Sequence, residues 1–429
     1  MYRMRDGRTL TGMKFLYRGC AAVVLLIGLV WGNATAQTYA VSSTLTDVSE
    51  VRPQVRIPLA PLGYFPPGEL PALSNYSLVA LDFIDSSHLL FSFNITGLMK
   101  RSEDCESDAD GMQHKMRAVV LNLPSGSVEN QTEWELSDYA PFLWPLQNGE
   151  FIFRRCSQIS LLDTHLELHP YIHTEGQFQL LGLSPDRSLL LLESKHVPHG
   201  AAAGKLSETE SSQSLAELRD IDMNFIRLHP LGVIAVSRIQ SLAAIPLLQA
   251  GFLEVVGVPH SKWQVNLQPY NEELRVLGRI NSTCIPQVVA LTDSTFLAAI
   301  CEGYPATLQF YQAYDLHGYR LWQKPVGENY SSPQFSYAAD ESRIAIAALH
   351  TTHAVAVLDP LSIEDLDGQR ITVYETHTGK RVLRVMTTPV YTAGGNFALS
   401  PHGNRLAVLH SGAIEIYSLN PQPKKPAGN

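Results

Sequence analysis

Two sets of residues in this chain have types and spacings that chemistry could use: an acidic segment and several histidines. The acidic segment, residues 102–111, reads SEDCESDADG and places five carboxylates in nine positions before a glycine. Glu106, Asp108 and Asp110 have the spacing that begins an EF-hand loop, and hard cations prefer such oxygens. The twelfth loop position is Arg117, where calcium needs a bidentate glutamate. We therefore predict a solvated acidic loop and no metal site.

The histidines form the second candidate set. His165, His169 and His173 are spaced by four residues, which would align them on a helix, but Pro170 and a strand-like context argue against a helix. Five more lie near the ends of second strands in the repeat described below: His196, His199, His350, His353 and His410. A metal site needs three or four ligands about 2.1 Å from one ion. Sequence spacing gives no sign of such convergence, so we expect surface histidines.

Motifs of nucleophilic catalysis and phosphate binding are absent from the sequence. It contains no G-x-S-x-G, no H-E-x-x-H and no G-x-x-x-x-G-K-[ST]. Asp186, Asp293 and Asp340 occupy predicted hairpin turns, where we expect them to hydrogen-bond their own backbone. An active site gathered from distant segments would leave no local motif, so catalysis stays open.

The elements that must position these residues are strands arranged as a repeated hairpin. Each copy has an apolar run, a tight turn rich in Asp, Gly, Ser or Asn, and a second apolar run, which is typical of strands rather than helices. Seven copies occur, at residues 78–93, 142–155, 178–194, 245–257, 287–300, 334–349 and 396–410. Second hairpins follow several of them, at residues 117–136, 308–324 and 370–385. Seven units of four strands predict a β-propeller.

The last copy has room for only three strands, ending near Leu419. A closed ring that left this blade short would expose a strand edge. We therefore predict that a strand within residues 38–60 supplies the missing outer strand. The predicted fold is all-β, a single seven-bladed propeller over residues 37–421 with a disordered tail at 422–429. Insertions blur the period enough that six or eight blades stay open.

Two hairpins carry a family resemblance. LSPDRSLLLL and LSPHGNRLAVLHSGAIEIYSL resemble the inner hairpins of WD-repeat-like and YVTN-type propellers, although the Gly-His and Trp-Asp markers of WD repeats are absent. Residues 117–155 are similar to a group of uncharacterised secreted bacterial propeller proteins. The resemblance implies the fold and a secreted protein, but it implies no activity.

The N-terminal segment predicts the compartment. Residues 20–32 are apolar, follow Lys14 and Arg18, and precede an A-x-A ending. Such a run is too short for a hydrocarbon core of ~30 Å and is typical of a signal peptide. We predict a signal peptide at residues 1–36, cleaved between Ala36 and Gln37, and a secreted or periplasmic protein. An uncleaved N-terminal anchor is the alternative.

Composition and charge exclude several classes of protein. A chain that is 45% hydrophobic and 17% charged is not intrinsically disordered. Removing residues 1–36 takes away five basic residues and one acid, which moves the formal charge from −9 to −13. Such an acidic body disfavours nucleic acid and anionic membranes as partners. We expect a monomer that is free of the membrane after cleavage.

Four cysteines remain after cleavage, an even number that indicates two disulfides in an oxidising compartment. Cys105 lies in the first insertion and Cys156 just beyond the equivalent strand of the next unit. Cys284 and Cys301 flank a single hairpin. We predict the pairs Cys105–Cys156 and Cys284–Cys301, with four buried free thiols as the alternative.

Three insertions break the repeat, at residues 95–116, 196–223 and about 350–369. Each follows the second strand of its unit, so all three fall on one rim of the propeller, where long loops often bind ligands. Neutral drift of tolerated loops is the alternative. The candidate binding residues on this rim are Glu106, Asp108, Asp110, His196, His350, His353 and His410.

We therefore expect a binding or scaffold module that acts through this rim, recognises a protein or a small polar ligand, and needs no cofactor. The alternative is a hydrolase or lyase acting on a sugar or peptide at the central channel. Carboxylates and histidines clustered at the channel mouth would favour the enzyme, whereas a channel filled with apolar side chains would favour the scaffold.

Overall fold

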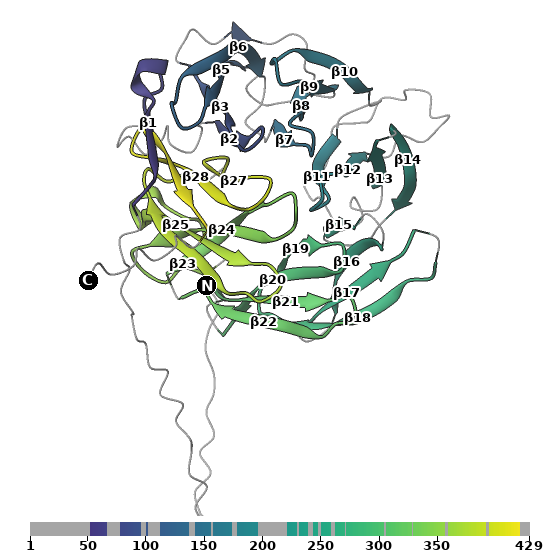
Figure 1. Ribbon diagram of the computed structural model, residues 1–429. Coiled ribbons are helices and arrows are strands. Elements are labelled where there is room, and N and C mark those ends of the chain that lie inside the picture. The colour runs from purple at the N-terminus through teal and green to yellow at the C-terminus, as the bar shows by residue number, and fades with distance from the viewer. Residues whose placement is uncertain are drawn as a thin grey trace, which may run out of the picture. The chain divides into compact units, whose positions relative to one another are not determined.

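In the computed structural model, the described residues form seven antiparallel sheets, six with four strands and one with five (Figure 1). The structure describes residues 52–66, 78–95, 100–101, 112–136, 142–155, 158–173, 178–195, 221–229, 231–238, 243–247, 250–258, 262–270, 272–303, 306–327, 329–356, 359–391 and 394–420. Inner strands of neighbouring sheets contact one another along the ring, and β27 contacts β2 to complete it. The protein is therefore the predicted seven-bladed β-propeller, and its sheets are called blades 1 to 7.

The first four blades use strands β2 to β18. Blade 1 contains β2 (Val79–Phe83), β3 (His88–Asn94), β5 (Met112–Asn122) and β6 (Val128–Leu136), and β4 (Lys100–Arg101) adds a short pair to β5. Blade 2 contains β7 (Leu143–Pro145), β8 (Phe151–Arg155), β9 (Gln158–Leu162) and β10 (Leu168–His173). Blade 3 contains β11 (Phe178–Leu183), β12 (Leu189–Lys195), β13 (Ile221–Leu228) and β14 (Leu231–Arg238). Blade 4 contains β15 (Ala243–Leu247), β16 (Gly251–Val258), β17 (Lys262–Gln268) and β18 (Arg275–Asn281).

The remaining blades use strands β19 to β29, together with β1. Blade 5 contains β19 (Gln287–Thr292), β20 (Thr295–Glu302), β21 (Thr307–Asp315) and β22 (Arg320–Pro325). Blade 6 contains β23 (Tyr330–Tyr337), β24 (Arg343–Thr351), β25 (Leu366–Glu375) and β26 (Arg381–Thr387). Blade 7 contains β27 (Phe397–Leu399), β28 (Arg405–His410), β29 (Ala413–Ser418) and β1 (Val55–Pro58). Two short 3₁₀ turns, η1 (Ala60–Leu62) and η3 (Ile363–Asp365), lie between strands.

The inner strands are apolar on both faces because each blade packs between two others. In β20, Phe296 and Ala298 join the cluster shared with blade 4, while Leu297 and Ala299 join the cluster shared with blade 6. A strand covered on both faces needs no polar alternation. This explains the continuous apolar runs that define the hairpin repeat.

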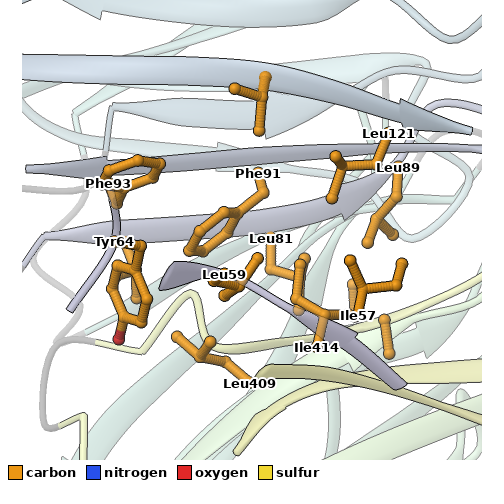
Figure 2. Packing of buried hydrophobic residues seen from close by; sticks show 14 of the residues in the cluster. Ile57, Leu59, Tyr64, Leu81, Leu89, Phe91, Phe93, Leu121, Leu409 and Ile414 are labelled. Atoms are coloured by element: carbon orange, nitrogen blue, oxygen red, sulfur yellow. The ribbon is translucent and has the colours of Figure 1, made fainter. Parts of the chain in front are cut away.

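The predicted closure by an N-terminal strand is confirmed. Strand β1 pairs antiparallel with β29, with Ile57 opposite Ile414, and it completes blade 7 (Figure 1). Ile57 and Leu59 are buried with residues of blades 1 and 7, among them Leu81 (Figure 2). Closure therefore combines backbone pairing in one blade with apolar packing against the next.

One of the two predicted disulfides is confirmed. Cys284, just before β19, is bonded to Cys301 in β20, with a Cα–Cα distance of 5.6 Å. Cys105 and Cys156 lie outside the described residues, as do the predicted signal peptide, its cleavage site and the tail at 422–429. Within the described ranges, no helix is long and apolar enough to cross a membrane.

The substitution Ile57→Ala tests the closure. We expect it to lower the free energy of unfolding by about 3 kcal/mol, because it removes buried methyl groups from the shared cluster. Urea denaturation followed by circular dichroism measures the change. The matched control is Arg56→Ala, whose side chain is largely exposed and forms an ion pair with Glu415, 3.4 Å from Nη1 to Oε1. We expect the control to cost below about 1 kcal/mol. Equal urea midpoints for Ile57→Ala and the unmodified protein would contradict closure by β1.

Candidate functional site

One described cavity lies along the inner strands of the ring. It has a volume of about 350 Å³ and is lined by residues of blades 1, 2, 3, 6 and 7. Most of its wall is aliphatic or aromatic, including Leu81, Trp144 and Leu183. Two charged residues, Asp82 and Arg187, are part of the lining. The volume falls in the range of ~300–1,000 Å³ found for small-molecule sites.

Asp82 reaches this cavity because of the alternation of β2. Leu81 and Phe83 face one side of β2 and join the core cluster that includes blade 7. Ala80 and Ile84, which face the same side of the strand as Asp82, join the cluster shared with blade 2. No described residue donates a hydrogen bond to the Asp82 carboxyl. Burial raises its pKa to about 7, and the nearby positive charge of Arg187 opposes that rise.

Arg187 enters the channel from the hairpin turn between β11 and β12. Its Nη2 donates a hydrogen bond of 2.9 Å to the carbonyl oxygen of Tyr337 in blade 6. The side chain thus reaches from blade 3 to blade 6, and the residue is only 9% exposed. Burial lowers the pKa of the guanidinium, and Asp82 opposes this by favouring the charged form. The two groups form a buried pair of opposite charge at the cavity wall.

The backbone conformation of Arg187 belongs to a turn position that recurs in the ring. Arg187, Glu341 and Gly403 have φ values of 61°, 57° and 60°. Each donates its backbone N–H to the residue three positions earlier, at 2.8, 2.9 and 2.8 Å. This left-handed conformation favours glycine, which blade 7 uses. Blades 3 and 6 place charged side chains there instead, at a local energetic cost typical of functional sites.

Asp186 holds the turn that carries Arg187, as predicted. Its carboxylate accepts hydrogen bonds from the Ser188 N–H at 3.2 Å and from the Ser184 hydroxyl. Asp340 likewise accepts one from the Ser342 N–H at 3.0 Å. Asp293 differs from the prediction, because its Oδ1 is buried without a hydrogen-bond partner among the described residues.

Three carboxylates from separate blades interact on the turn side of the channel. Burial, together with the charges of Asp293 and Asp186, raises the pKa of Glu341 to about 7. The Asp293 backbone N–H donates a hydrogen bond to Glu341. Burial and Asp186 also raise the pKa of Asp293, and burial and both acids raise the pKa of the partly buried Tyr270 hydroxyl in blade 4. Turns after a first strand lie at the opposite end of a blade from connections after a second strand. The acids therefore lie opposite the predicted insertion-bearing rim.

The predicted rim histidines that fall within the described ranges have local partners. His350 Nδ1 bonds to Asp367 Oδ1, and its ring lies 4.6 Å from that of Tyr330. His353 Nδ1 lies 3.8 Å from Asp365 Oδ1. His410 Nδ1 accepts a hydrogen bond of 3.2 Å from the Thr388 N–H. Glu106, Asp108, Asp110 and His196 lie outside the described residues. A shared binding rim stays a prediction.

One described group has side chains that a metal ion could use. Ligand atoms of Asp163, Glu167 and His169 lie within 4.8 Å of one another. Asp163 and Glu167 lie in the turn between β9 and β10, and His169 lies in β10. In this turn Asp163 Oδ1 accepts hydrogen bonds from the backbone N–H groups of His165 and Glu167. His169 Nε2 lies 3.0 Å from Asp163 Oδ2. These bonds give the carboxylate a structural role in the turn, and we assign no metal to it.

Comparison with known proteins establishes no family for this chain. No family model and no curated protein matches the chain. Among solved structures, a chain of a mitotic checkpoint complex is 12% identical, with 86% of this chain and 92% of that one covered and a TM-score of 0.45. Hydrazine synthase from Kuenenia stuttgartiensis is 12% identical (83% and 98% covered, TM-score 0.45). An acylaminoacyl peptidase from Pyrococcus horikoshii is 11% identical (82% and 53% covered, TM-score 0.48). We draw no functional conclusion from them.

The substitution Asp82→Asn tests the buried carboxyl through the pH dependence of stability. The folded protein holds a proton on Asp82 up to about pH 7, whereas an unfolded chain releases it near the ordinary aspartate pKa of 3.8. The contribution of this group to folding stability therefore falls as the pH rises between these values. The quantity to compare is the free energy of unfolding of Asp82→Asn minus that of the unmodified protein. This difference should rise by about 2 kcal/mol from pH 5 to pH 8.

Urea denaturation at both pH values measures this difference, and the contribution of Glu341 is common to both proteins. The matched control is Glu135→Gln, which removes the same charge from an exposed position on β6. We expect its stability difference to be the same at both pH values. A constant difference for Asp82→Asn would mean that Asp82 has an ordinary pKa in the folded protein.

Proposed function

We propose that this protein is a binding propeller that holds a small organic ligand in its central channel and does not transform it. The observation that carries the proposal is the cavity of about 350 Å³, whose mostly apolar wall contains one carboxyl and one guanidinium group. Small-molecule sites commonly combine an apolar wall, which supplies affinity, with a few polar groups that fix orientation. Asp82 and Arg187 would supply that orientation.

The insertion-bearing rim would surround the entrance to this channel. The lining includes Leu78, Phe142 and Gly394, which lie just before the inner strands of blades 1, 2 and 7. Inner strands begin on the same face as the connections after second strands. The predicted insertions at 95–116, 196–223 and about 350–369 would then shape the access of the ligand. This joins the predicted binding rim and the described cavity in one site.

The cellular setting we propose is secretion or the periplasm, as a monomeric member of the WD-repeat-like or YVTN-type propellers. The Cys284–Cys301 disulfide supports an oxidising compartment. The apolar segment at 20–32 supports export, and the hairpin sequences support the family assignment. A ligand-binding protein outside the cytoplasm would meet small molecules directly from the surroundings.

One observation favours the alternative, a hydrolase or lyase at the channel. Glu341 has a pKa raised to about 7 beside Asp293, and general acids and bases work best with such values. A catalytic site also needs a nucleophile or a second proton carrier within hydrogen-bond reach. The described hydrogen bond of the Glu341 side chain comes from the Asp293 backbone N–H, not from another side chain that could carry a proton or act as nucleophile. Binding is therefore the better-supported function.

Fluorescence titration tests binding in the channel, because Trp144 lines the cavity. The probes are four compounds that share a phenyl group: L-phenylalanine, 3-phenylpropionate, 2-phenylethylamine and 3-phenylpropanol. We expect at least one to change tryptophan emission with saturation at millimolar concentration or below. In Trp144→Phe the signal change should disappear while calorimetry still detects binding.

Two outcomes would contradict the proposal. No saturable binding of any probe would remove the support for a small-molecule site. Binding that alters emission equally in the unmodified protein and in Trp144→Phe would place the ligand elsewhere. Turnover of a sugar or peptide substrate that is lost in Glu341→Gln would establish the enzyme instead.

A further inference from the structure

We propose that the channel ligand is a small zwitterion with an apolar body, namely an apolar α-amino acid, whose carboxylate binds Arg187 and whose ammonium group binds Asp82. This inference rests on the proposed function and names the ligand class of the same site. It follows from the hydrogen-bonding capacity, the charge and the wall chemistry of the cavity.

Arg187 has donors to offer a carboxylate. A guanidinium carries five N–H donors in a planar fork, which matches the two oxygens of a carboxylate. The contacts of the described residues use one of these nitrogens, Nη2, for the Tyr337 carbonyl oxygen. That bond also fixes the side chain across the channel, so the guanidinium is positioned before a ligand arrives. A positioned donor loses less conformational entropy on binding.

Asp82 has acceptor capacity to offer an ammonium group. Its carboxyl lines the cavity and accepts no hydrogen bond from a described residue. A buried carboxylate without hydrogen-bond donors is unfavourable, and an ammonium group supplies three. A ligand amine at this position would therefore satisfy the one acidic side chain in the wall.

The charge balance of the cavity selects a neutral ligand with two charged ends. Above about pH 7, where Asp82 is ionised, Asp82 and Arg187 together carry no net charge, and each influences the other electrostatically. A ligand with a single charge would repel one member of the pair or leave it without a partner in a cavity that excludes water. Either result costs binding free energy. A zwitterion pairs both groups and adds no net charge. This distinguishes an amino acid from a simple acid or a simple amine.

The remaining wall fits an apolar side chain. Leu81, Leu183 and Phe335 belong to the lining, together with Trp144. Apolar surface buried against such residues supplies binding free energy in proportion to its area. Among the polar side chains of the wall, Ser184, Gln334 and Ser336 already form hydrogen bonds within the protein, which leaves few partners for a polar side chain on the ligand. The class is thereby narrowed to amino acids such as leucine or phenylalanine.

Isothermal titration calorimetry on the purified full-length protein at pH 8, where Asp82 is charged, tests the class directly. L-Phenylalanine is compared with 3-phenylpropionate, which lacks the ammonium group, and 2-phenylethylamine, which lacks the carboxylate. We expect the amino acid to have a Kd at least tenfold lower than either analogue. An analogue that binds as tightly as the amino acid would overturn the inference and leave channel binding intact. Absence of binding by all three would overturn the inference, and if 3-phenylpropanol also fails to bind, channel binding is overturned with it.

Substitutions assign the two ends of the ligand. We expect Arg187→Gln to raise the Kd for L-phenylalanine at least tenfold. The same substitution should not raise the Kd for 2-phenylethylamine. We expect Asp82→Asn to raise the Kd for L-phenylalanine at least tenfold as well. This substitution should not raise the Kd for 3-phenylpropionate. The double variant Asp82→Asn/Arg187→Gln keeps the cavity neutral and should lose the preference for the zwitterion. Glu135→Gln is the matched control and should bind as the unmodified protein does. Unchanged affinity for L-phenylalanine in both single variants would overturn the inference, and the analogue comparison tests it without any variant.

Discussion

Hydrogen bonds between β1 and β29 join the two ends of the described chain within blade 7. The residues that follow β1, Leu59 and Tyr64, pack with blade 1 (Figure 2). The Tyr64 hydroxyl bonds to the hydroxyl of Tyr391. Blade 7 is thus completed by β1 and tied to blade 1 by the same segment. A ring closed this way leaves blade 7 no unpaired edge on β29, and it holds the inner strands at set positions around the channel.

The channel depends on this constraint because its polar residues come from distant parts of the chain. Asp82 belongs to blade 1, Arg187 to blade 3 and the Tyr337 carbonyl to blade 6. None of these is a sequence neighbour of another, so only the closed ring brings them to one cavity. The recurring turn position with φ near 60° orients Arg187, because it directs the chain so that the Arg187 side chain reaches across the channel. The geometry of the site therefore depends on the closure of the ring.

Much of the fold follows from local sequence, and the site does not. The short apolar runs and Asp- or Gly-rich turns are local signals, so the seven hairpins, the closing strand and the Cys284–Cys301 bond could be predicted. The site escaped prediction because convergence across a ring has no local signature. Two weak signals existed: Asp82 is an acid inside the apolar run LVALDFID, and Arg187 occupies a turn position where blade 7 has Gly403. The spacings of the Asp and His residues predicted a binding site on the rim instead. The described histidines of that rim bind separate partners.

A crystal structure of the protein grown with saturating L-phenylalanine tests the central claim most directly. The account predicts density for the amino acid in the central channel, with its carboxylate within hydrogen-bond distance of the Arg187 guanidinium and its ammonium group on Asp82. A channel without ligand density, in which Asp82 and Arg187 bond directly to each other, would contradict it.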